Sequence, residues 1–373
     1  MKTFKILIAV FLIALLFTGC SERNDLSELS IVEGMGIDYV DDEISVTVQT
    51  LNLSKEGSGA EALSGNVTMN TEGRGSNISG AIENATEKLS KKIFFGQNRI
   101  IVFGMSMAES YIDKNIDYLL RSSDSRSDVK ICIADGEASK VMESKENNSL
   151  VPSESITSLL AMGEESGFGA SVTTNELLNM YLDKTSDIYL PVVKAEKESV
   201  SVSGIAVYNK QRLAAVLDEN ETFGLLMLRN KINTGFLEVK NSELGETGVD
   251  IIKSKTKTSA SYENGRVVFR AKIKADLMLD AVEKGHITTL TNKHLQDIQK
   301  LVENEMIEYC SRAFTECVKG ESDCLRVGES LAMCSPKAYD ILSDNWKEAF
   351  SDAVLEIEAK CRFKKINENS KGD

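Results

Sequence analysis

Residues 249–279 read VDIIKSKTKTSASYENGRVVFRAKIKADLML and predict a long β-hairpin. On both sides of Asn264-Gly265, apolar and polar residues alternate with a period of two, which is typical of strands with one buried face. An Asn-Gly pair favours a two-residue turn, because both residues tolerate the positive φ angles that this turn requires. The sequence therefore predicts two antiparallel strands at residues 249–262 and 266–279.

A long helix is expected after this hairpin. Apolar residues recur every three or four positions across residues 295–317, and they would line one face of a helix that packs on the sheet. A second helical region covers residues 324–350, and residues 354–363 form a closing edge strand. We therefore predict residues 245–373 as a C-terminal α+β domain in which an antiparallel sheet is flanked by helices.

The first half of the chain predicts further α+β structure. Residues 29–50 contain two strands separated by a turn of two aspartates, and helices and strands then alternate. Because the opening hairpin is antiparallel, we expect a mixed sheet rather than a doubly wound parallel one. Residues 20–188 are predicted as an N-terminal α+β domain. Residues 189–244 are predicted as a small middle domain that begins near a junction at Pro191, which gives three domains in all.

The composition excludes several functional classes. The chain has 373 residues with 43 Lys and Arg against 57 Asp and Glu, so its acidic surface repels phosphate backbones and we expect no nucleic-acid partner. Its two histidines, His286 and His294, are too few for the usual triads or three-histidine metal sites. Acidic pairs such as Glu164-Glu165 are common in so acidic a chain and do not indicate a hydrolase. We therefore predict no enzymatic activity, no cofactor and no metal site.

The N-terminus has the pattern of a bacterial lipoprotein signal peptide. Two lysines precede twelve apolar residues, 6–17, a run too short for the ~20 residues of a membrane-spanning helix. The tetrapeptide FTGC at residues 17–20 resembles a lipobox. We predict that residues 1–19 are removed and that Cys20 carries the lipid. Two acyl chains give stable attachment, since each buried methylene adds ~0.8 kcal/mol, so the body is expected to be tethered to the outer face of the membrane without spanning it.

Six further cysteines follow Cys20, at positions 132, 310, 317, 324, 334 and 361. Outside the cytosol an even number of cysteines is compatible with disulfides. Cys310 and Cys317, however, would lie two helical turns apart, ~10 Å along the axis, which exceeds the ~7 Å Cα separation that a disulfide tolerates. The chain has no C-x-x-C pair that would indicate zinc. We therefore predict buried free thiols, while the sequence leaves open whether the cysteines at 310, 317, 324 and 334 ever form disulfides.

Several short motifs follow one another along the chain. They are the lipobox at Cys20, LSIVEGMGID at residues 29–38, GIAVY at 204–208 with LDENET at 217–222, DCLRVG at 323–328, Ser335-Pro336 and NWKEAF at 345–350. Their order and spacing resemble the Ger(x)C family, the lipoprotein C subunit of bacterial spore nutrient-germinant receptors. The chain departs from the pattern of this family at residues 121–126, RSSDSR, and in the cysteines of its C-terminal third.

The resemblance implies a three-domain α+β protein without enzymatic activity that takes part in spore germination. It also implies membrane-embedded A-type and B-type receptor subunits as partners, and a lipid-anchored position on the outer face of the bacterial or spore inner membrane. An extracytoplasmic solute-binding lipoprotein is the alternative. Such proteins usually have two repeated α/β lobes around a cleft, which the strand-rich C-terminal region does not offer.

Overall fold

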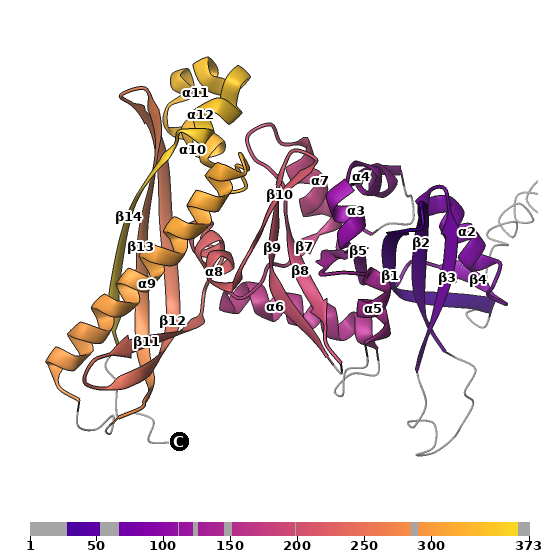
Figure 1. The fold of residues 1–373 in the computed structure, drawn as a ribbon, viewed down its shortest axis with the longest axis horizontal. Coiled ribbons are helices and arrows are strands. Elements are labelled where there is room, and N and C mark those ends of the chain that lie inside the picture. The colour runs from indigo at the N-terminus through magenta and orange to yellow at the C-terminus, as the bar shows by residue number, and fades with distance from the viewer. Residues whose placement is uncertain are drawn as a thin grey trace, which may run out of the picture.

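The computed structural model describes residues 28–52, 67–110, 112–121, 126–144, 151–197, 199–284 and 290–364. These residues form a ten-stranded and a four-stranded sheet, both packed by helices, which confirms the α+β class. The two sheets follow one another along the long axis of the molecule, and α8 (Glu219–Leu228) lies between them (Figure 1). No helix among the described residues is long and apolar enough to cross a bilayer.

The larger sheet is mixed. Its strand order is β10-β9-β8-β6-β5-β1-β2-β3, with β4 paired to β1 and β7 paired to β6. The central strands β1, β5, β6 and β8 run parallel, and the pairs on either side of them are antiparallel. The strands are β1 (Leu29–Val40), β2 (Glu43–Leu51), β3 (Thr68–Gly75), β4 (Lys92–Phe94), β5 (Ile100–Gly104), β6 (Lys130–Ala134), β7 (Val172–Thr173), β8 (Tyr189–Ala195), β9 (Val200–Asn209) and β10 (Arg212–Leu217).

Helices cover both faces of the central parallel strands. Every residue of β5 is buried, because Ile100 and Val102 pack toward one face while Ile101 and Phe103 pack toward the other. A strand that is buried on both faces reads as a continuous apolar run, which explains the sequence IIVFG. The first face is covered by α5 (Ala138–Glu143) and α6 (Pro152–Ser166). The other helices of this unit are α2 (Ile78–Thr86), α3 (Met105–Ser110), α4 (Ile112–Arg121) and α7 (Thr174–Leu182).

Residues 189–217, which the sequence assigned to a middle domain, continue the larger sheet. β8 pairs in parallel with β6 through Ile133 and Val192, and β9 and β10 extend the sheet beyond β8. Pro191 therefore lies inside β8 rather than at a junction. The pairing with β6 starts only at Val192, so the missing N–H of the proline interrupts no pair on that side. In chain order, β10 is the last strand of the larger sheet and β11 (Gly235–Asn241) is the first strand of the smaller one. The division into three domains, with its boundaries, stays a prediction.

The smaller sheet contains the long hairpin predicted from the sequence. β12 (Gly245–Glu263) and β13 (Arg266–Val282) are antiparallel, and Asn264 and Gly265 form the turn with φ angles of 50° and 82°. The strand order is β11-β12-β13-β14. β14 (Val354–Phe363) runs parallel to β13, so the prediction of a purely antiparallel C-terminal sheet is wrong. The helices between β13 and β14 form the crossover connection that a parallel pair requires.

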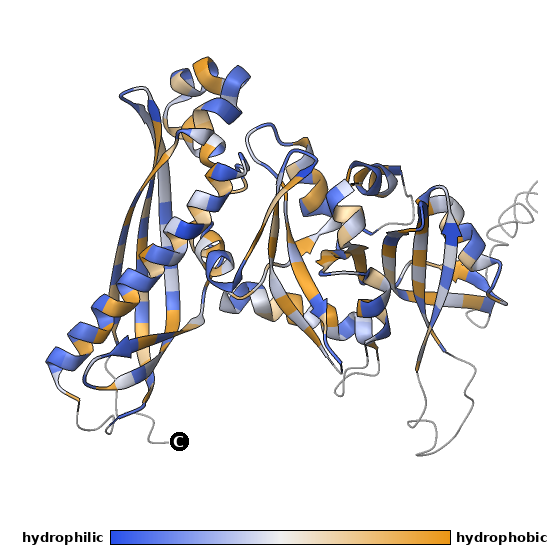
Figure 2. Cartoon of the chain, viewed as in Figure 1, coloured by the Kyte–Doolittle hydropathy of each residue, from blue (hydrophilic) through white to orange (hydrophobic). Residues whose placement is uncertain are grey.

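The amphipathic helix predicted after the hairpin is confirmed as α9 (Asn292–Lys319), which lies along the smaller sheet (Figure 1). A capping box between Thr291 and His294 closes its N-terminus. Hydrophilic residues predominate over the rest of its surface (Figure 2). Three short helices, α10 (Val327–Cys334), α11 (Pro336–Leu342) and α12 (Trp346–Ser351), follow before β14. The buried side chains of α9 are Ile298, Val302, Met306, Cys310, Ala313, Phe314 and Cys317.

Candidate functional site

The packing of α8 against α9 joins the two parts of the molecule. Gly224 makes this contact possible, because a Cβ at this position would overlap the backbone of Tyr309. At the start of α8, Asp218 and Glu221 form a capping box. Arg312 of α9 pairs with both carboxylates, and its Nη2 lies 3.1 Å from Glu221 Oε1. The LDENET motif therefore begins α8 and also binds it to α9.

Two buried aspartates, Asp187 before β8 and Asp323 after α9, connect the larger sheet to the C-terminal helices. The Asp187 N–H donates to the Asp323 carbonyl at 3.2 Å, and the Asp323 N–H donates to Asp187 Oδ2 at 2.7 Å. Lys347 Nζ donates to the same Oδ2, and the Lys210 backbone N–H donates to Asp187 Oδ1 at 3.0 Å. The Asp187 carboxylate thus collects donors from the β9–β10 turn, from the loop after α9 and from α12.

The Asp323 carboxylate is fully buried at the start of α10. Oδ1 accepts the Val327 N–H at 2.8 Å, and Oδ2 accepts the Gly328 N–H at 2.7 Å and the Trp346 indole N–H at 3.0 Å. Burial raises the pKa of this carboxyl to about 7, and the nearby Asp187 adds to the rise, whereas the three hydrogen bonds act in the opposite direction. Asp323 therefore ties the loop after α9 to α10 and α12.

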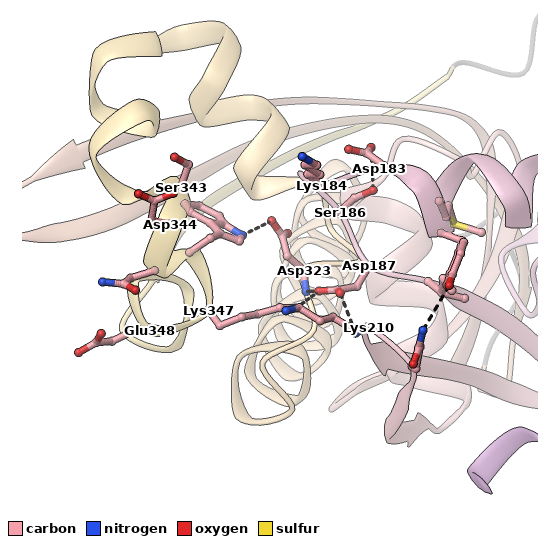
Figure 3. Close-up of a pocket in the computed structure, with 16 residues that line it drawn as sticks. Asp183, Lys184, Ser186, Asp187, Lys210, Asp323, Ser343, Asp344, Lys347 and Glu348 are labelled. Atoms are coloured by element: carbon pink, nitrogen blue, oxygen red, sulfur yellow. Dashed lines mark hydrogen bonds and ion pairs between the residues drawn. The ribbon is translucent and has the colours of Figure 1, made fainter. Parts of the chain in front are cut away.

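A cavity of about 640 Å³ lies beside this pair of aspartates (Figure 3). Its walls come from the end of α7, the loop before β8, the β9–β10 turn and the start of α12. Figure 3 shows the Lys347 side chain and the Lys210 backbone N–H directed toward Asp187. Charged groups of both signs line the cavity together with the rings of Tyr181 and Trp346. The described lining residues include no histidine or cysteine, so no Ser-His or Cys-His pair lies in this wall.

Cys20, the predicted lipid-attachment residue, lies outside the described residues, as do residues 1–19 and His286. Across the described ranges, no group of three or more His, Cys, Asp or Glu side chains could hold a metal ion. Five of the six later cysteines are buried, as predicted, and Cys334 is exposed; in the structure none of the six is bonded to another. The prediction is wrong at Cys334 because α10 ends at this residue and the chain turns into α11 at Pro336.

The N-terminal motif at residues 29–38 forms β1 and also provides a helix cap. The two carboxylate oxygens of Asp38 accept the N–H groups of Ala138 and Ser139 at 2.7 and 2.9 Å, at the start of α5. Burial raises the pKa of the Asp38 carboxyl, although the two backbone hydrogen bonds act in the opposite direction. This aspartate therefore has a structural partner within the N-terminal unit.

Sequence reasoning found the motifs on one side of the junction and missed their partners on the other. The NWKEAF motif contains Trp346, which is buried, but the motif does not predict the hydrogen bond of this side chain to Asp323. Asp187 and Lys210 were not singled out. Asp187 is 136 residues from Asp323 along the chain. Its one local signal, an aspartate before an apolar strand, is too common to indicate a site.

Comparison with known proteins identifies the class to which this two-sheet α+β fold belongs. A family model described as the spore germination protein N-terminal domain matches residues 22–195. A second, described as spore germination B3/GerAC like, C-terminal, matches residues 203–367. The chain therefore belongs to this family of spore germination proteins, which confirms the resemblance to the Ger(x)C family.

Particular relatives match over nearly the whole length. Spore germination protein KC of Bacillus subtilis (strain 168) is 23% identical over 390 residues, which cover 95% of this chain and 94% of that protein. Spore germination protein B3 of the same strain is 21% identical over 375 residues, 98% of each chain. The crystal structure of the GerBC protein aligns with a TM-score of 0.60 at 17% identity and covers 91% of this chain and 100% of that one. This alignment shows a shared fold.

Proposed function

We propose that this protein is a non-catalytic, lipid-anchored subunit of a spore nutrient-germinant receptor. The observation that carries the proposal is the match of the two family models, which together extend from residue 22 to residue 367. In this role the chain is attached through Cys20 to the outer face of the bacterial or spore inner membrane. There it contacts membrane-embedded A-type and B-type subunits during spore germination.

The segment between Cys20 and the folded body supports attachment close to the bilayer. Glu28, the first described residue, follows Cys20 by eight residues, and an extended segment of that length spans at most about 28 Å. The formal net charge of the whole sequence is −14, and removal of residues 1–19 with their two lysines leaves a more acidic body, so its overall charge gives no attraction to anionic lipids. The proposal therefore assigns stable membrane attachment to the two acyl chains of a lipoprotein anchor.

The junction between the two sheets supports a role in contact rather than in catalysis. The carboxylates of Asp187 and Asp323 are occupied by donors of the protein itself, which come from the loops and helices on both sides. Such internally satisfied groups hold two units in a fixed relation. A subunit that relays contacts between a membrane and its partners needs a connection of this kind.

Replacement of the lipidated residue tests the anchor and the function together. In a Cys20→Ala strain we expect an unprocessed precursor without acyl mass, and spores that lose most of their response to nutrients while cortex-hydrolysing activity remains. The exposed Cys334→Ala is the matched control and should behave as the wild type. Mass spectrometry of the co-purified complex reads the acyl group and the neighbouring subunits. A full nutrient response from the Cys20→Ala spores would contradict the proposed attachment.

The cavity favours one second candidate, an extracytoplasmic solute-binding lipoprotein. Its volume of about 640 Å³ falls within the ~300–1,000 Å³ range of small-molecule sites, and it lies where the larger sheet meets the C-terminal helices. Calorimetric titration of the full-length protein with amino acids, sugars and nucleosides distinguishes the two functions. Tight, saturable binding by the protein alone would favour the solute-binding function.

A further inference from the structure

Two buried cysteines meet at the base of the loop that carries Asp323. Cys317 lies in the last turn of α9, and Cys324 directly follows Asp323. Their Sγ atoms are 3.5 Å apart, and neither residue is exposed to solvent. A disulfide has an S–S length of ~2.05 Å, so the two sulfur atoms need to approach by only ~1.5 Å. Small rotations of the two side chains supply a movement of that size.

The backbone between the two cysteines already brings them together. α9 ends at Lys319 with Gly320 as its C-cap, and Glu321 has a left-handed φ of 52°. The Ser322 N–H donates back to the Cys317 carbonyl at 2.9 Å. These features reverse the chain at the end of α9 and return Cys324 to the side of Cys317. Since the reversal is held by backbone hydrogen bonds, a cross-link at this place needs no new path of the chain.

The other described cysteines have different neighbours. Cys310 donates toward the Gly224 carbonyl at 3.6 Å, and Cys361 lies 3.8 Å from a methionine sulfur. Cys132 is buried in the apolar core of the larger sheet, and Cys334 is exposed. The structure therefore singles out the pair at the base of the loop.

We propose that Cys317 and Cys324 form a disulfide bond in the mature protein, and that this bond locks the loop carrying Asp323 onto α9. Each thiol gives up one proton and one electron, and the two sulfur atoms join. The two electrons and two protons reduce the disulfide of a thiol oxidoreductase, or of a small-molecule oxidant, to two thiols. The inference goes beyond the proposed function and uses it at one point, because a location outside the cytoplasm provides such an oxidant.

Burial determines when this bond forms. The hydrogen bond with Cys324 and the loss of water raise the pKa of the Cys317 thiol well above its usual value. The thiolate is the form that attacks a disulfide, so the folded, reduced pair reacts slowly. We therefore expect oxidation while the chain folds, before α9 and α10 cover the loop. Once formed, the buried bond is protected from reductants in the solvent.

The bond would act where the larger sheet and the C-terminal helices are connected. Arg229, directly after α8, donates to the Cys324 carbonyl, and its guanidinium lies 4.6 Å from the centre of the Tyr189 ring in β8. Asp323 exchanges hydrogen bonds with Asp187. A covalent bond at the base of the loop keeps these partners in place when individual hydrogen bonds at the junction break.

Thiol mapping of the full-length protein, purified from membranes in detergent, tests the proposal. The protein is denatured without reductant, alkylated with iodoacetamide and analysed by peptide mass spectrometry. We expect Cys310 and Cys334 to be alkylated at once, and Cys317 and Cys324 only after reduction, with their linked peptides lighter by two hydrogen atoms. Direct alkylation of the last two overturns the proposal. The acyl group on Cys20, read in the same spectra, reports on the proposed anchor independently.

A stability measurement on variants gives a second readout. With reductant present, the bond is reduced once heating exposes it, so the midpoint of thermal unfolding of the wild type should fall by about 3 °C or more, because the unfolded chain gains entropy when it is no longer cross-linked. The double variant Cys317→Ala/Cys324→Ala should lack this reductant-dependent shift. The control Cys310→Ala removes a buried thiol outside the pair and should retain it. An equal shift in all three proteins, or none in the wild type, overturns the proposal.

Discussion

The fully buried carboxylate of Asp323 balances lost hydration against three hydrogen bonds. Part of the water that would hydrate the charged form is replaced by the backbone N–H groups of Val327 and Gly328 and the indole N–H of Trp346. The pKa of the Asp323 carboxyl still rises to about 7. Near neutral pH this side chain therefore changes its charge at the point where the loop after α9, α10 and α12 meet. A single residue thus makes the junction sensitive to protons.

Asp323 makes stability depend on pH in the direction opposite to that of a salt-bridged carboxylate. Its folded pKa of about 7 exceeds the ordinary value of 3.8, so between these values the folded state binds more protons than the unfolded state. The free energy of unfolding therefore falls as the pH rises from ~4 to ~7, by up to about 4 kcal/mol from this residue. We expect Asp323→Asn to remove this fall, measured by urea unfolding at about pH 5 and pH 7.5.

Asp344→Asn is the matched control for this pH dependence. Asp344 is exposed on the wall of the same cavity, so its replacement should keep the wild-type difference between the two pH values. Asp323→Asn should also lower stability in general, because its amide N–H₂ faces a backbone donor that the carboxylate accepted. If the wild type and Asp323→Asn show the same pH difference, the buried carboxylate does not titrate in this range.

At the scale of helices and strands, local sequence patterns are sufficient to predict an element whose structure depends mainly on its own residues. The Asn264-Gly265 turn and the apolar stripe of residues 295–317 follow from residue type and spacing. The pairing of β8 with β6 and the parallel pairing of β14 with β13 cannot be predicted in this way. These pairs depend on packing between segments that are distant along the chain. Asp187 could not be predicted as part of the junction for the same reason, because its partner Asp323 lies far along the chain.

The contact between α8 and α9 depends on the absence of a side chain at Gly224. Gly224→Ala places a Cβ against the backbone of Tyr309 and 2.7 Å from the Cys310 nitrogen, which forces the helices apart. We expect the free energy of unfolding to fall by about 1–3 kcal/mol, measured by urea denaturation. Gly80→Ala in α2 is the control, because its Cβ would meet Asn77 at an ordinary 3.5 Å. Equal losses in both variants would contradict this account.

At the scale of the whole molecule, an elongated protein depends on the few contacts that join its parts. The first strand and the C-terminal sheet lie at opposite ends of the long axis (Figure 1). With the proposed anchor at Cys20, the C-terminal sheet therefore stands at the end opposite to the attached segment. The α8–α9 packing and the bonds of Asp187 are among the contacts that couple the two ends.

The contact of Lys347 with Asp187 should control this coupling. Lys347→Met keeps the bulk of the side chain and removes the ammonium group, which also donates to the Glu321 carbonyl at 2.8 Å. Asp187 keeps its two backbone donors, so we expect the fold to survive with a loosened junction. Amide hydrogen exchange should become faster in residues 183–188 and 320–328, by about tenfold for each ~1.4 kcal/mol of lost local stability.

Lys319→Met is the matched control for this change in exchange. Lys319 is an exposed lysine that pairs at 2.6 Å with Glu316 on its own helix, α9, so its loss breaks no contact between the two sheets. Exchange at the junction should therefore remain at the wild-type rate in this control. Unchanged exchange in Lys347→Met, or an equal increase in both variants, would show that the junction is held without the Lys347 ion pair. A selective increase would instead mean that one ion pair sets how firmly the C-terminal sheet follows the rest of the molecule.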